Sequence, residues 1–329
     1  MVAAVSEELL VSHAQNAEDV VLWRALGSVQ NGRYVEVGAN HPAVDSISKA
    51  FYDRGWAGVA VEPVPAFAQA YREARPRDVV VEAAVTDAAE QEVVLHVFEG
   101  TGLSTVREDI SAGHEASGIE ATEVRVPARR LDDVLVEHVP AGEEIHFLMV
   151  DVEGAEHDVL RSIDLSVHRP WVLVVEATAP RSRDRTHHEW EHIVLGNGYV
   201  HAMFDGLSQW YVAQEHVDLL PELDHPACPL DSWVPIRTFV AERRVESLDA
   251  ELGGVRLENA ELTRQVVSWR GRVLEQWAKA ARTATSARGS SDNGHLRQEL
   301  DALQRTLSWR ITAPLRSVRS AQLRRSRRP

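Results

Sequence analysis

Cysteine is almost absent from this chain, because Cys228 is the single cysteine among 329 residues and no internal disulfide can form. Long apolar runs are missing too: no stretch approaches the roughly 18 uninterrupted apolar residues that a membrane span needs. Residues 1–10 contain Glu7 and Glu8 without a basic cluster, unlike a secretory signal. These absences predict a cytoplasmic globular protein in a reducing compartment.

The chain is acidic overall but has a basic C-terminus. The net charge of −15 argues against general nucleic-acid binding by the body of the protein. Residues 310–329 contain no acid, so removing their arginines from the total leaves −22 on the rest of the chain. This asymmetry indicates that the tail has a separate role. The arginines of the tail are Arg310, Arg316, Arg319, Arg324, Arg325, Arg327 and Arg328.

Short apolar runs alternate with amphipathic segments from residue 34 onward. This alternation predicts an α/β fold, with a mostly parallel sheet covered by helices on both faces. A hairpin joined at Asp205-Gly206 closes it in the antiparallel sense. Ser12 and Gln15 have the spacing of a capping box for a helix that follows. The expected strands are 34–37, 58–61, 78–81, 93–98, 123–127, 145–150, 171–175, 199–204 and 209–212, and the expected helices include 46–54, 66–74 and 156–163.

Beyond residue 240, apolar residues alternate spacings of three and four, as in a coiled-coil seam. Asn259 occupies an a-type position, which favours a parallel, in-register homodimer. Gly253 and Gly254 weaken the helix by about 1 kcal/mol each. The expected organisation is a globular domain over 1–236, a coiled-coil helix over 237–287, a polar linker over 288–295, and a short helix with the basic tail over 296–329. The seam is Val245, Leu248, Leu252, Val255, Asn259, Leu262, Val266, Trp269 and Val273.

The first strand ends in a glycine turn, Glu36-Val-Gly38-Ala-Asn40. Gly38 has no Cβ, so a ligand can approach the backbone at the carboxyl edge of the sheet. Glu62 closes the second strand, where an acid can accept hydrogen bonds from a ribose diol. The alternative is a plain tight turn beside a solvated strand end.

The turn lacks the features of a pyrophosphate loop. The glycines of Gly-x-Gly-x-x-Gly are replaced by Asn40 and Ala43, and Pro42 has no N–H to offer. A nicotinamide-dependent oxidoreductase is therefore disfavoured. A ligand with a ribose and no phosphate, such as S-adenosylmethionine, fits better.

Acidic residues follow a buried strand at Asp151-Val-Glu153-Gly-Ala-Glu156. Methyl transfer to oxygen needs a base for the acceptor proton, and Asp151, Glu153, Glu156 and His157 are candidates. Glu156 also suits the first turn of a helix, which we favour for it. Asp151 and Glu176 end separate strands and could hold Mg²⁺ together, but nothing fixes such a site and we expect no metal. Histidines elsewhere lack metal-ligand spacing.

Several segments together resemble the FkbM family of S-adenosylmethionine-dependent methyltransferases, over residues 12 to about 215. They are Ser-His-Ala-Gln-Asn-Ala-Glu-Asp from Ser12, Tyr-Val-Glu-Val-Gly-Ala-Asn-His-Pro from Tyr34, Val-Glu-Pro at Val61, Arg-Leu-Asp-Asp-Val from Arg130, and Met-Val-Asp-Val-Glu-Gly-Ala-Glu-His-Asp-Val-Leu from Met149. The resemblance implies a class I methyltransferase fold and O-methylation, often of sugars or natural-product hydroxyls.

The resemblance also implies roles for individual residues. It places Glu36, Gly38, Ala39, Asn40 and Ser46 around the methionine end of the cofactor, Glu62 on the ribose, and Ala84 and Val85 beside the adenine. Asp151 and Glu153 match the acidic motif of the family. Glu36 departs from it, because many members have aspartate there.

The segment from Leu307 to Arg316 resembles C-terminal segments of bacterial enzymes that build surface polysaccharides, which suggests a glycan acceptor. Trp309, Ile311 and Leu315 with the arginines form either a peripheral membrane contact or a disordered solubilising tail. We therefore expect a glycan or small-molecule O-methyltransferase. The alternative is a scaffold without catalysis that recruits glycan-assembly enzymes through its coiled coil.

Overall fold

The computed structural model describes residues 9–98, 102–116, 120–286 and 293–316 of the chain. The chain divides into two compact units, residues 1–244 and 245–329, and each is considered by itself. Within the described ranges, no helix combines the length and the hydropathy needed to cross a membrane.

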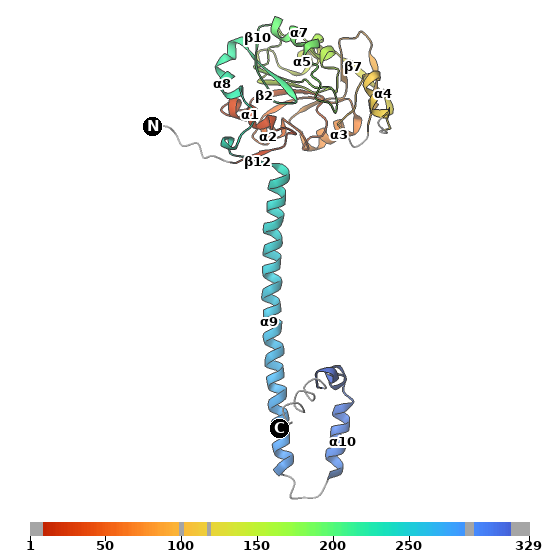
Figure 1. Cartoon of the computed structure of the whole chain (residues 1–329), viewed down its shortest axis with the longest axis vertical. Coiled ribbons are helices and arrows are strands. Elements are labelled where there is room, and N and C mark those ends of the chain that lie inside the picture. Colours follow the sequence, from red (N-terminus) through yellow and green to blue (C-terminus); the bar gives the residue numbers. More distant parts are fainter. Residues whose placement is uncertain (1–8, 99–101, 117–119, 287–292, 317–329) are drawn as a thin grey trace, which may run out of the picture. The chain divides into compact units, whose positions relative to one another are not determined.

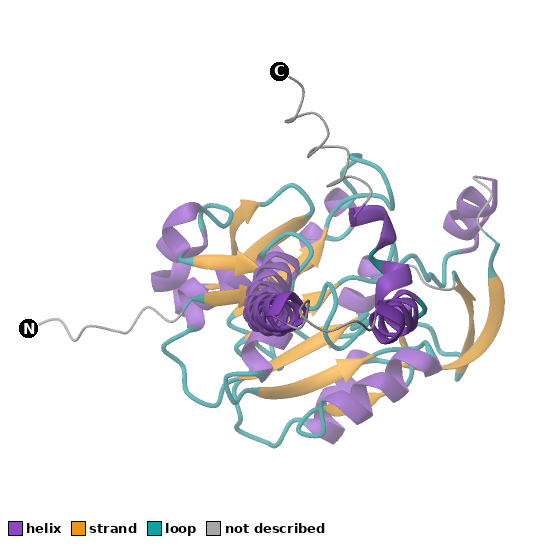
Figure 2. Ribbon diagram, turned by 90° about the horizontal axis from the view of Figure 1, so that it is seen from below, coloured by secondary structure: helices purple, strands orange, loops and turns teal. Residues whose placement is uncertain are grey.

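A seven-stranded sheet forms the centre of the first unit (Figures 1 and 2). Its strand order is β10-β11-β9-β8-β2-β3-β4, and β11 alone runs against its neighbours. Successive strands are added on one side of β2 up to β4, and on its other side from β8 onward. This reversal of strand order between β2 and β8 is the point where ligands bind in doubly wound sheets. The mostly parallel sheet with an antiparallel closing hairpin confirms the predicted fold class. The strands are β2 (Arg33–Val37), β3 (Ala57–Val61), β4 (Val79–Val81), β8 (Phe147–Val150), β9 (Val172–Glu176), β10 (Tyr199–Phe204) and β11 (Ser208–Ala213).

Both faces of this sheet are buried, which is why its strands are continuous apolar runs. In β8, Leu148 and Val150 pack into one core with α5, α6 and α7. Phe147 and Met149 pack into the other core, with α1, α2 and α8. The helices are α1 (Glu18–Leu26), α2 (Lys49–Tyr52), α3 (Pro65–Ala74), α5 (Leu131–His138), α6 (Glu156–Arg161), α7 (Glu191–Gly196) and α8 (Leu220–Leu223), with short 3₁₀ turns η1 (His187–Glu189), η2 (Gln214–Leu219) and η3 (Pro229–Asp231).

A smaller sheet of order β5-β7-β6 is inserted between β4 and β8. Its strands β6 (Glu92–Val97) and β7 (Thr122–Arg129) are antiparallel and match the strands expected over 93–98 and 123–127. Strand β5 (Ala84–Val85) pairs with β7 in parallel. Between β6 and β7 lies α4 (Glu108–Ala116). The sheet adds a wall to one side of the main sheet's carboxyl edge.

The prediction of a helix capping box at Ser12 and Gln15 is wrong. Ser12 ends a strand, β1 (Leu10–Ser12), and its hydroxyl donates to Asp19 at 2.7 Å. Helix α1 begins only at Glu18, after Ala17 in a left-handed conformation. The Asp19 carboxylate also accepts the backbone N–H of His13, so it organises the turn that the expected cap would have organised.

The helix expected over 46–54 is shorter than predicted, because α2 covers only Lys49–Tyr52. The residues before it are held in an irregular loop. The carbonyl of Pro42 and the hydroxyls of Ser46 and Ser48 all bond to the side chain of Arg75. This tertiary bonding replaces the helical bonding that the pattern indicated.

Strand β12 (Trp233–Pro235) pairs in parallel with β1, and neither three-residue strand was predicted. It leads directly into α9 (Ile236–Ser286), a continuous helix that passes through Gly253 and Gly254 without a break. The seam residues Val245 to Trp269 are exposed on it.

Helices α10 (Asn293–Gln304) and α11 (Leu307–Ile311) follow in the second unit. The expected linker falls mostly on residues 287–292, which lie outside the described residues. Trp309 contacts Trp277 at 6.1 Å between ring centroids, and the Arg316 guanidinium lies 4.0 Å from the Trp309 ring centroid. The arginines of the tail beyond Arg316 also lie outside the described residues.

Candidate functional site

A cavity of about 260 Å³ opens at the carboxyl ends of β2, β3 and β8, where the strand order reverses. Most of the residues predicted for the cofactor and for catalysis lie in its lining. They are Glu36, Gly38, Ala39, Asn40, Glu62, Ala84, Val85, Asp151 and Glu153. Sequence positions as far apart as 36 and 153 therefore meet at one edge of the sheet.

The glycine turn is required by backbone packing as well as by ligand access. Gly38 has a φ of +81°, and a Cβ there would lie 1.7 Å from the carbonyl oxygen of Asp151. The N–H groups of Gly38 and Ala39 both donate to the carbonyl of Val61, at 3.0 and 3.2 Å. The turn is thus clamped between the ends of β3 and β8, and a side chain at this position has no room.

Glu62 lies in the cavity wall with its carboxylate fixed from behind. One oxygen accepts the N–H of Asn40 at 2.6 Å, and the other accepts the N–H of Val64 at 2.8 Å. Only 3% of the residue is exposed, and burial raises the pKa of Glu62 to about 7. Each oxygen retains a second lone pair, so the group can still accept hydrogen bonds from a diol.

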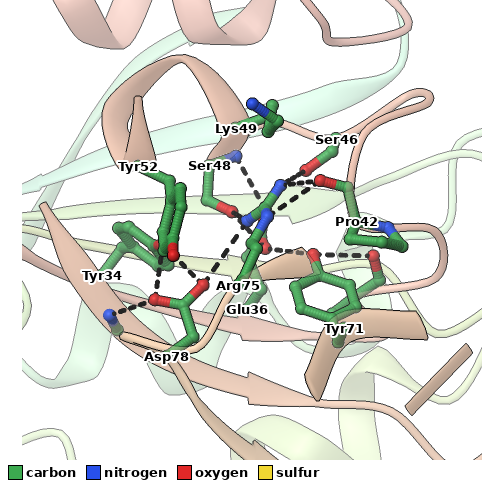
Figure 3. A network of polar contacts seen from close by, with 12 residues as sticks. Tyr34, Glu36, Pro42, Ser46, Ser48, Lys49, Tyr52, Tyr71, Arg75 and Asp78 are labelled. Atoms are coloured by element: carbon green, nitrogen blue, oxygen red, sulfur yellow. Dashed lines mark hydrogen bonds and ion pairs between the residues drawn. The ribbon is translucent and has the colours of Figure 1, made fainter. Parts of the chain in front are cut away.

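Glu36 is held by a buried network of polar contacts (Figure 3). Its carboxylate accepts the N–H of Ser48 at 2.9 Å, the Ser48 hydroxyl at 2.6 Å and the Tyr71 hydroxyl at 3.0 Å. Tyr71 also lies 3.2 Å from the carbonyl of Ala39. These bonds fix both the acid and the turn that follows it.

Arg75, at the end of α3, is the cation of this network and is fully buried (Figure 3). Its guanidinium donates to the carbonyl of Pro42 and to the Ser46 and Ser48 hydroxyls, and lies 3.6 Å from Asp78. No periodicity in the sequence singled out Arg75, because an arginine in the last turn of a helix usually faces solvent.

Ser46 differs in placement from the expectation. Its neighbours Asp45 and Ile47 line the cavity, but Ser46 is absent from the lining and is 2% exposed. Its hydroxyl accepts from Arg75 at 2.6 Å. In this arrangement Ser46 supports the loop from behind.

Four carboxyl groups gather where β8 and β9 end. Asp151 and Glu153 line the cavity, whereas Glu156 and Glu176 are buried and not among the lining residues. Burial raises the pKa of all four, to about 8 for Glu153 and about 7 for Glu156. Each of the other three carboxyls raises the pKa of Glu176 further.

Asp151 and Glu176 meet, as their positions at the ends of neighbouring strands suggested. A hydrogen bond joins their carboxyl groups, which two acids can form only by holding a proton between them. Burial raises the pKa of both carboxyls, and the charge of Asp151 raises that of Glu176 further. Among the described residues, no group of three or more acidic, histidine or cysteine side chains has the arrangement of a metal site.

The loop that carries Glu153 is strained and tied down. Glu153 and Gly154 have φ of +53° and +95°. The Thr105 hydroxyl donates to the carbonyl of Glu153 at 2.9 Å, and Arg107 donates to that of Gly154 at 3.3 Å. Glu156 accepts the N–H of Gly154 at 3.0 Å, which matches its expected place at a helix start. The Glu153 carboxyl itself keeps one buried oxygen without a partner in the structure.

The cavity lining combines apolar and acidic side chains. Phe67, Val85 and Leu95 are apolar and suited to a flat ring such as adenine. Gln15 and several acids complete the lining. Among the described residues of the lining there is no lysine, arginine or histidine, so the site favours a ligand with an apolar part and a cationic part.

Comparisons with known proteins agree with this geometry. The family model described as "Methyltransferase FkbM domain" matches residues 36–200, just over half of the chain. No curated protein sequence matches at a significant level.

Two solved structures are similar to the chain at low identity. One is a TehB-like SAM-dependent methyltransferase from Corynebacterium glutamicum, with a TM-score of 0.34 and 7% identity over 59% of this chain and 86% of that one. The other is an O-methyltransferase from Bacillus cereus in complex with SAH, with a TM-score of 0.32 and 11% identity over 62% of this chain and 84% of that one.

Replacing Arg75 with methionine tests the buried network. We expect Arg75→Met to lower the free energy of unfolding by about 3–5 kcal/mol, because it leaves buried partners of the guanidinium uncompensated. Arg72→Met is the matched control: Arg72 lies in the same helix in an exposed pair with Glu82, and its loss should cost less than about 1 kcal/mol. Urea unfolding measures both. Equal effects would contradict the role assigned to Arg75.

Proposed function

Because the chain belongs to the methyltransferase FkbM domain family, we propose that it transfers a methyl group to a hydroxyl oxygen, of a sugar in a surface glycan or of a natural product. The enzyme is a methyltransferase that uses S-adenosylmethionine, the cofactor of this family. The observation that carries the oxygen-directed chemistry is the carboxyl of Asp151, which lies in the cavity wall with a pKa raised by burial.

The residues of the cavity fit the cofactor. Glu62 offers free lone pairs to the ribose hydroxyls, and the apolar part of the lining that includes Ala84 and Val85 receives the adenine. The turn at Gly38 with Ala39 and Asn40, together with Glu36, lines the part left for the methionine end. When bound, S-adenosylmethionine supplies an electrophilic methyl group on a positively charged sulfur.

Asp151 is positioned to act as the general base. An alcohol must lose its proton as its oxygen takes the methyl group, and a carboxylate with a raised pKa is a stronger base than an ordinary one. Asp151 accepts that proton in the proposed reaction, and Glu176 lies beside it at the end of β9. Glu153, with one unpartnered oxygen, orients the acceptor hydroxyl.

A neutral polyhydroxyl acceptor agrees with the charges of the site. Five acids line the cavity, namely Glu36, Asp45, Glu62, Asp151 and Glu153. An anionic acceptor would be repelled by them, and none of the lining residues that the structure describes is basic. The segment from Leu307 to Arg316, which resembles C-terminal segments of enzymes that build surface polysaccharides, also supports a glycan acceptor.

The scaffold alternative rests on α9, whose exposed apolar seam is a surface for another helix. It does not account for the strained Glu153 loop or for the buried acid pair, features that stabilise nothing by themselves. We therefore favour an enzyme that also associates through α9. Contact of the basic tail with anionic lipid remains part of the proposal.

Association of two copies through α9 is supported by the charges that flank the seam. With Asn259 at an a position, Arg244 and Glu251 occupy g positions of the heptad, and Asp249 and Arg256 occupy e positions. In a parallel pair of helices, Arg244 then faces Asp249 of the second helix, and Glu251 faces its Arg256. Both pairs have opposite charge, and the two Asn259 side chains face each other. A parallel, in-register homodimer satisfies all three.

S-adenosylmethionine should stabilise the native protein. At a hundredfold excess over its Kd the gain is about 2.7 kcal/mol, or roughly 5–10 °C in Tm for a unit of this size.

Glu62→Gln should weaken binding roughly tenfold to a hundredfold by removing a charged acceptor from the ribose. Glu73→Gln, an exposed glutamate of α3, is the control. Calorimetry showing no binding to the wild type, or equal Kd values for it and Glu62→Gln, would refute the assignment.

Methyl transfer itself is tested by mass spectrometry of glycans and small molecules from cells with and without the gene. We expect a product that is heavier by one methyl group only when the gene is present. Asp151→Asn should lower turnover of that product about a hundredfold or more while leaving cofactor binding in place. A variant that methylates at the wild-type rate would show that Asp151 is not the base.

The dimer is tested in the full-length chain by sedimentation. Leu262→Glu places a charge in a d position of the seam and should shift the protein toward monomer. Leu257→Glu is the matched control, because Leu257 is 74% exposed and lies outside the seam. If both variants sediment like the wild type, the seam is not the interface.

A further inference from the structure

Glu176 is a buried acid that does not line the cavity but contacts a residue that does. It is 6% exposed, and a hydrogen bond joins its carboxyl to that of Asp151. Its second oxygen, Oε2, is buried without a partner in the structure. Ser208, directly opposite on β11, is fully buried and its hydroxyl also has no partner. The charged groups that act on Glu176 are all acids, so a second negative charge beside Asp151 has no counter-ion among the described residues.

The surroundings of the pair are acidic on nearly every side. Glu153 and Glu156 act on the pair directly, Glu36 and Asp45 line the same cavity, and Arg107 bonds to the neighbouring Gly154 carbonyl. Glu36 lies within the field of Arg75, and Arg107 pairs with Asp109 while bonding to the Gly154 carbonyl. Neither cation is directed at the Asp151–Glu176 pair by any of these bonds. A proton is the charge that is available to neutralise it.

We propose that the Asp151–Glu176 pair stores one proton in the free protein and releases it when the sulfonium cation of S-adenosylmethionine enters the cavity, so that the site distinguishes the charged donor from its neutral product. The inference rests on the proposed function and deepens it, since it concerns how the same cavity recognises its ligand. The release is a simple ionisation, in which the carboxylic acid becomes a carboxylate and the proton passes to buffer. Glu176 is the positioning residue that holds the proton against Asp151.

The two ligands differ in the charge that matters. S-adenosylmethionine and S-adenosylhomocysteine share the adenosine, the amino group and the carboxylate, and only the former has a positively charged sulfur. A cation within a few ångströms favours the ionised form of a carboxyl, whereas a neutral thioether leaves the proton in place. Burial raises the pKa of both members of the pair, so the free site keeps its proton to a higher pH than an ordinary carboxyl would.

The sign of the pH dependence follows from this release. Binding that expels a proton strengthens as pH rises, until the free site has lost that proton by itself. For a difference of one proton, the ratio of the Kd of S-adenosylhomocysteine to that of S-adenosylmethionine should rise about tenfold per pH unit for as long as the free pair still holds its proton. It should level off once the pH exceeds the raised pKa values.

The proton count is measured by isothermal calorimetry of the full-length protein in two buffers of different ionisation enthalpy. At pH 6.5 the amino groups of both ligands stay protonated, because an ordinary α-amino pKa is about 7.7–8.0. We expect release of about one proton with S-adenosylmethionine and of almost none with S-adenosylhomocysteine. Equal counts for the two ligands would overturn the inference.

Glu176→Gln separates the pair from the rest of the site. The amide can still donate to Asp151 but holds no titratable proton, so release should fall below half of the wild-type value and the Kd ratio should lose most of its pH dependence. Glu18→Gln is the matched control: burial raises the pKa of Glu18 to about 8, but outside this cluster, so the wild-type count should persist. Wild-type release by Glu176→Gln would refute the role of Glu176.

Each failure has its own signature. If neither ligand binds the wild type, the proposed function falls and this inference falls with it. If both bind with equal proton counts, the inference alone is wrong and the cofactor assignment stands. Should Glu176→Gln not fold, the wild-type comparison of the two ligands decides, with sinefungin as a third probe that has an amine in place of the sulfonium and should behave like S-adenosylmethionine.

Discussion

The guanidinium of Arg75 is the interaction on which the cavity depends. A fully buried cation must be surrounded by acceptors, and here these come from the loop between β2 and α2 and from Asp78 before β4. The same hydroxyl of Ser48 that meets Arg75 also donates to Glu36, so one charge fixes both the loop and the acid at the edge of β2. The shape of the methionine end follows from bonds made behind its wall.

The acidic residues at the ends of β8 and β9 differ from the Arg75 network, because some of their polar atoms have no partner. Around Arg75 every polar group has a partner, whereas Glu153 and Glu176 each retain a buried oxygen with none. Completed networks stabilise a fold, and incomplete ones are retained where a ligand or a proton completes them. The first side of the site is built for rigidity and the second for chemistry, although both consist of the same residue types.

The sequence predicted the parts of this arrangement that are periodic or local. Strands such as Val172–Glu176 are apolar on both faces, so their length and type were readable. The positions of Asp151 and Glu176 at strand ends indicated that they could meet. The short strands β1 and β12 have three residues each and no period to detect. Arg75 escaped notice because its burial depends on contacts with residues 27 to 33 positions away. The shortened α2 has the same cause.

The parallel pairing of β1 with β12 joins a segment near the start of the first unit to a segment near its end. Leu10 donates its N–H to the carbonyl of Ser232 and packs in a small core with Trp233, immediately before α9 begins. From β1 the chain passes directly to the turn that brings Gln15 to the cavity. A shortened chain that removes residues 9–12, or that cuts before Pro235, leaves an open strand edge at one end and a loosened binding wall at the other. The start of α9 and the segment that brings Gln15 to the cavity therefore depend on the same pair of strands.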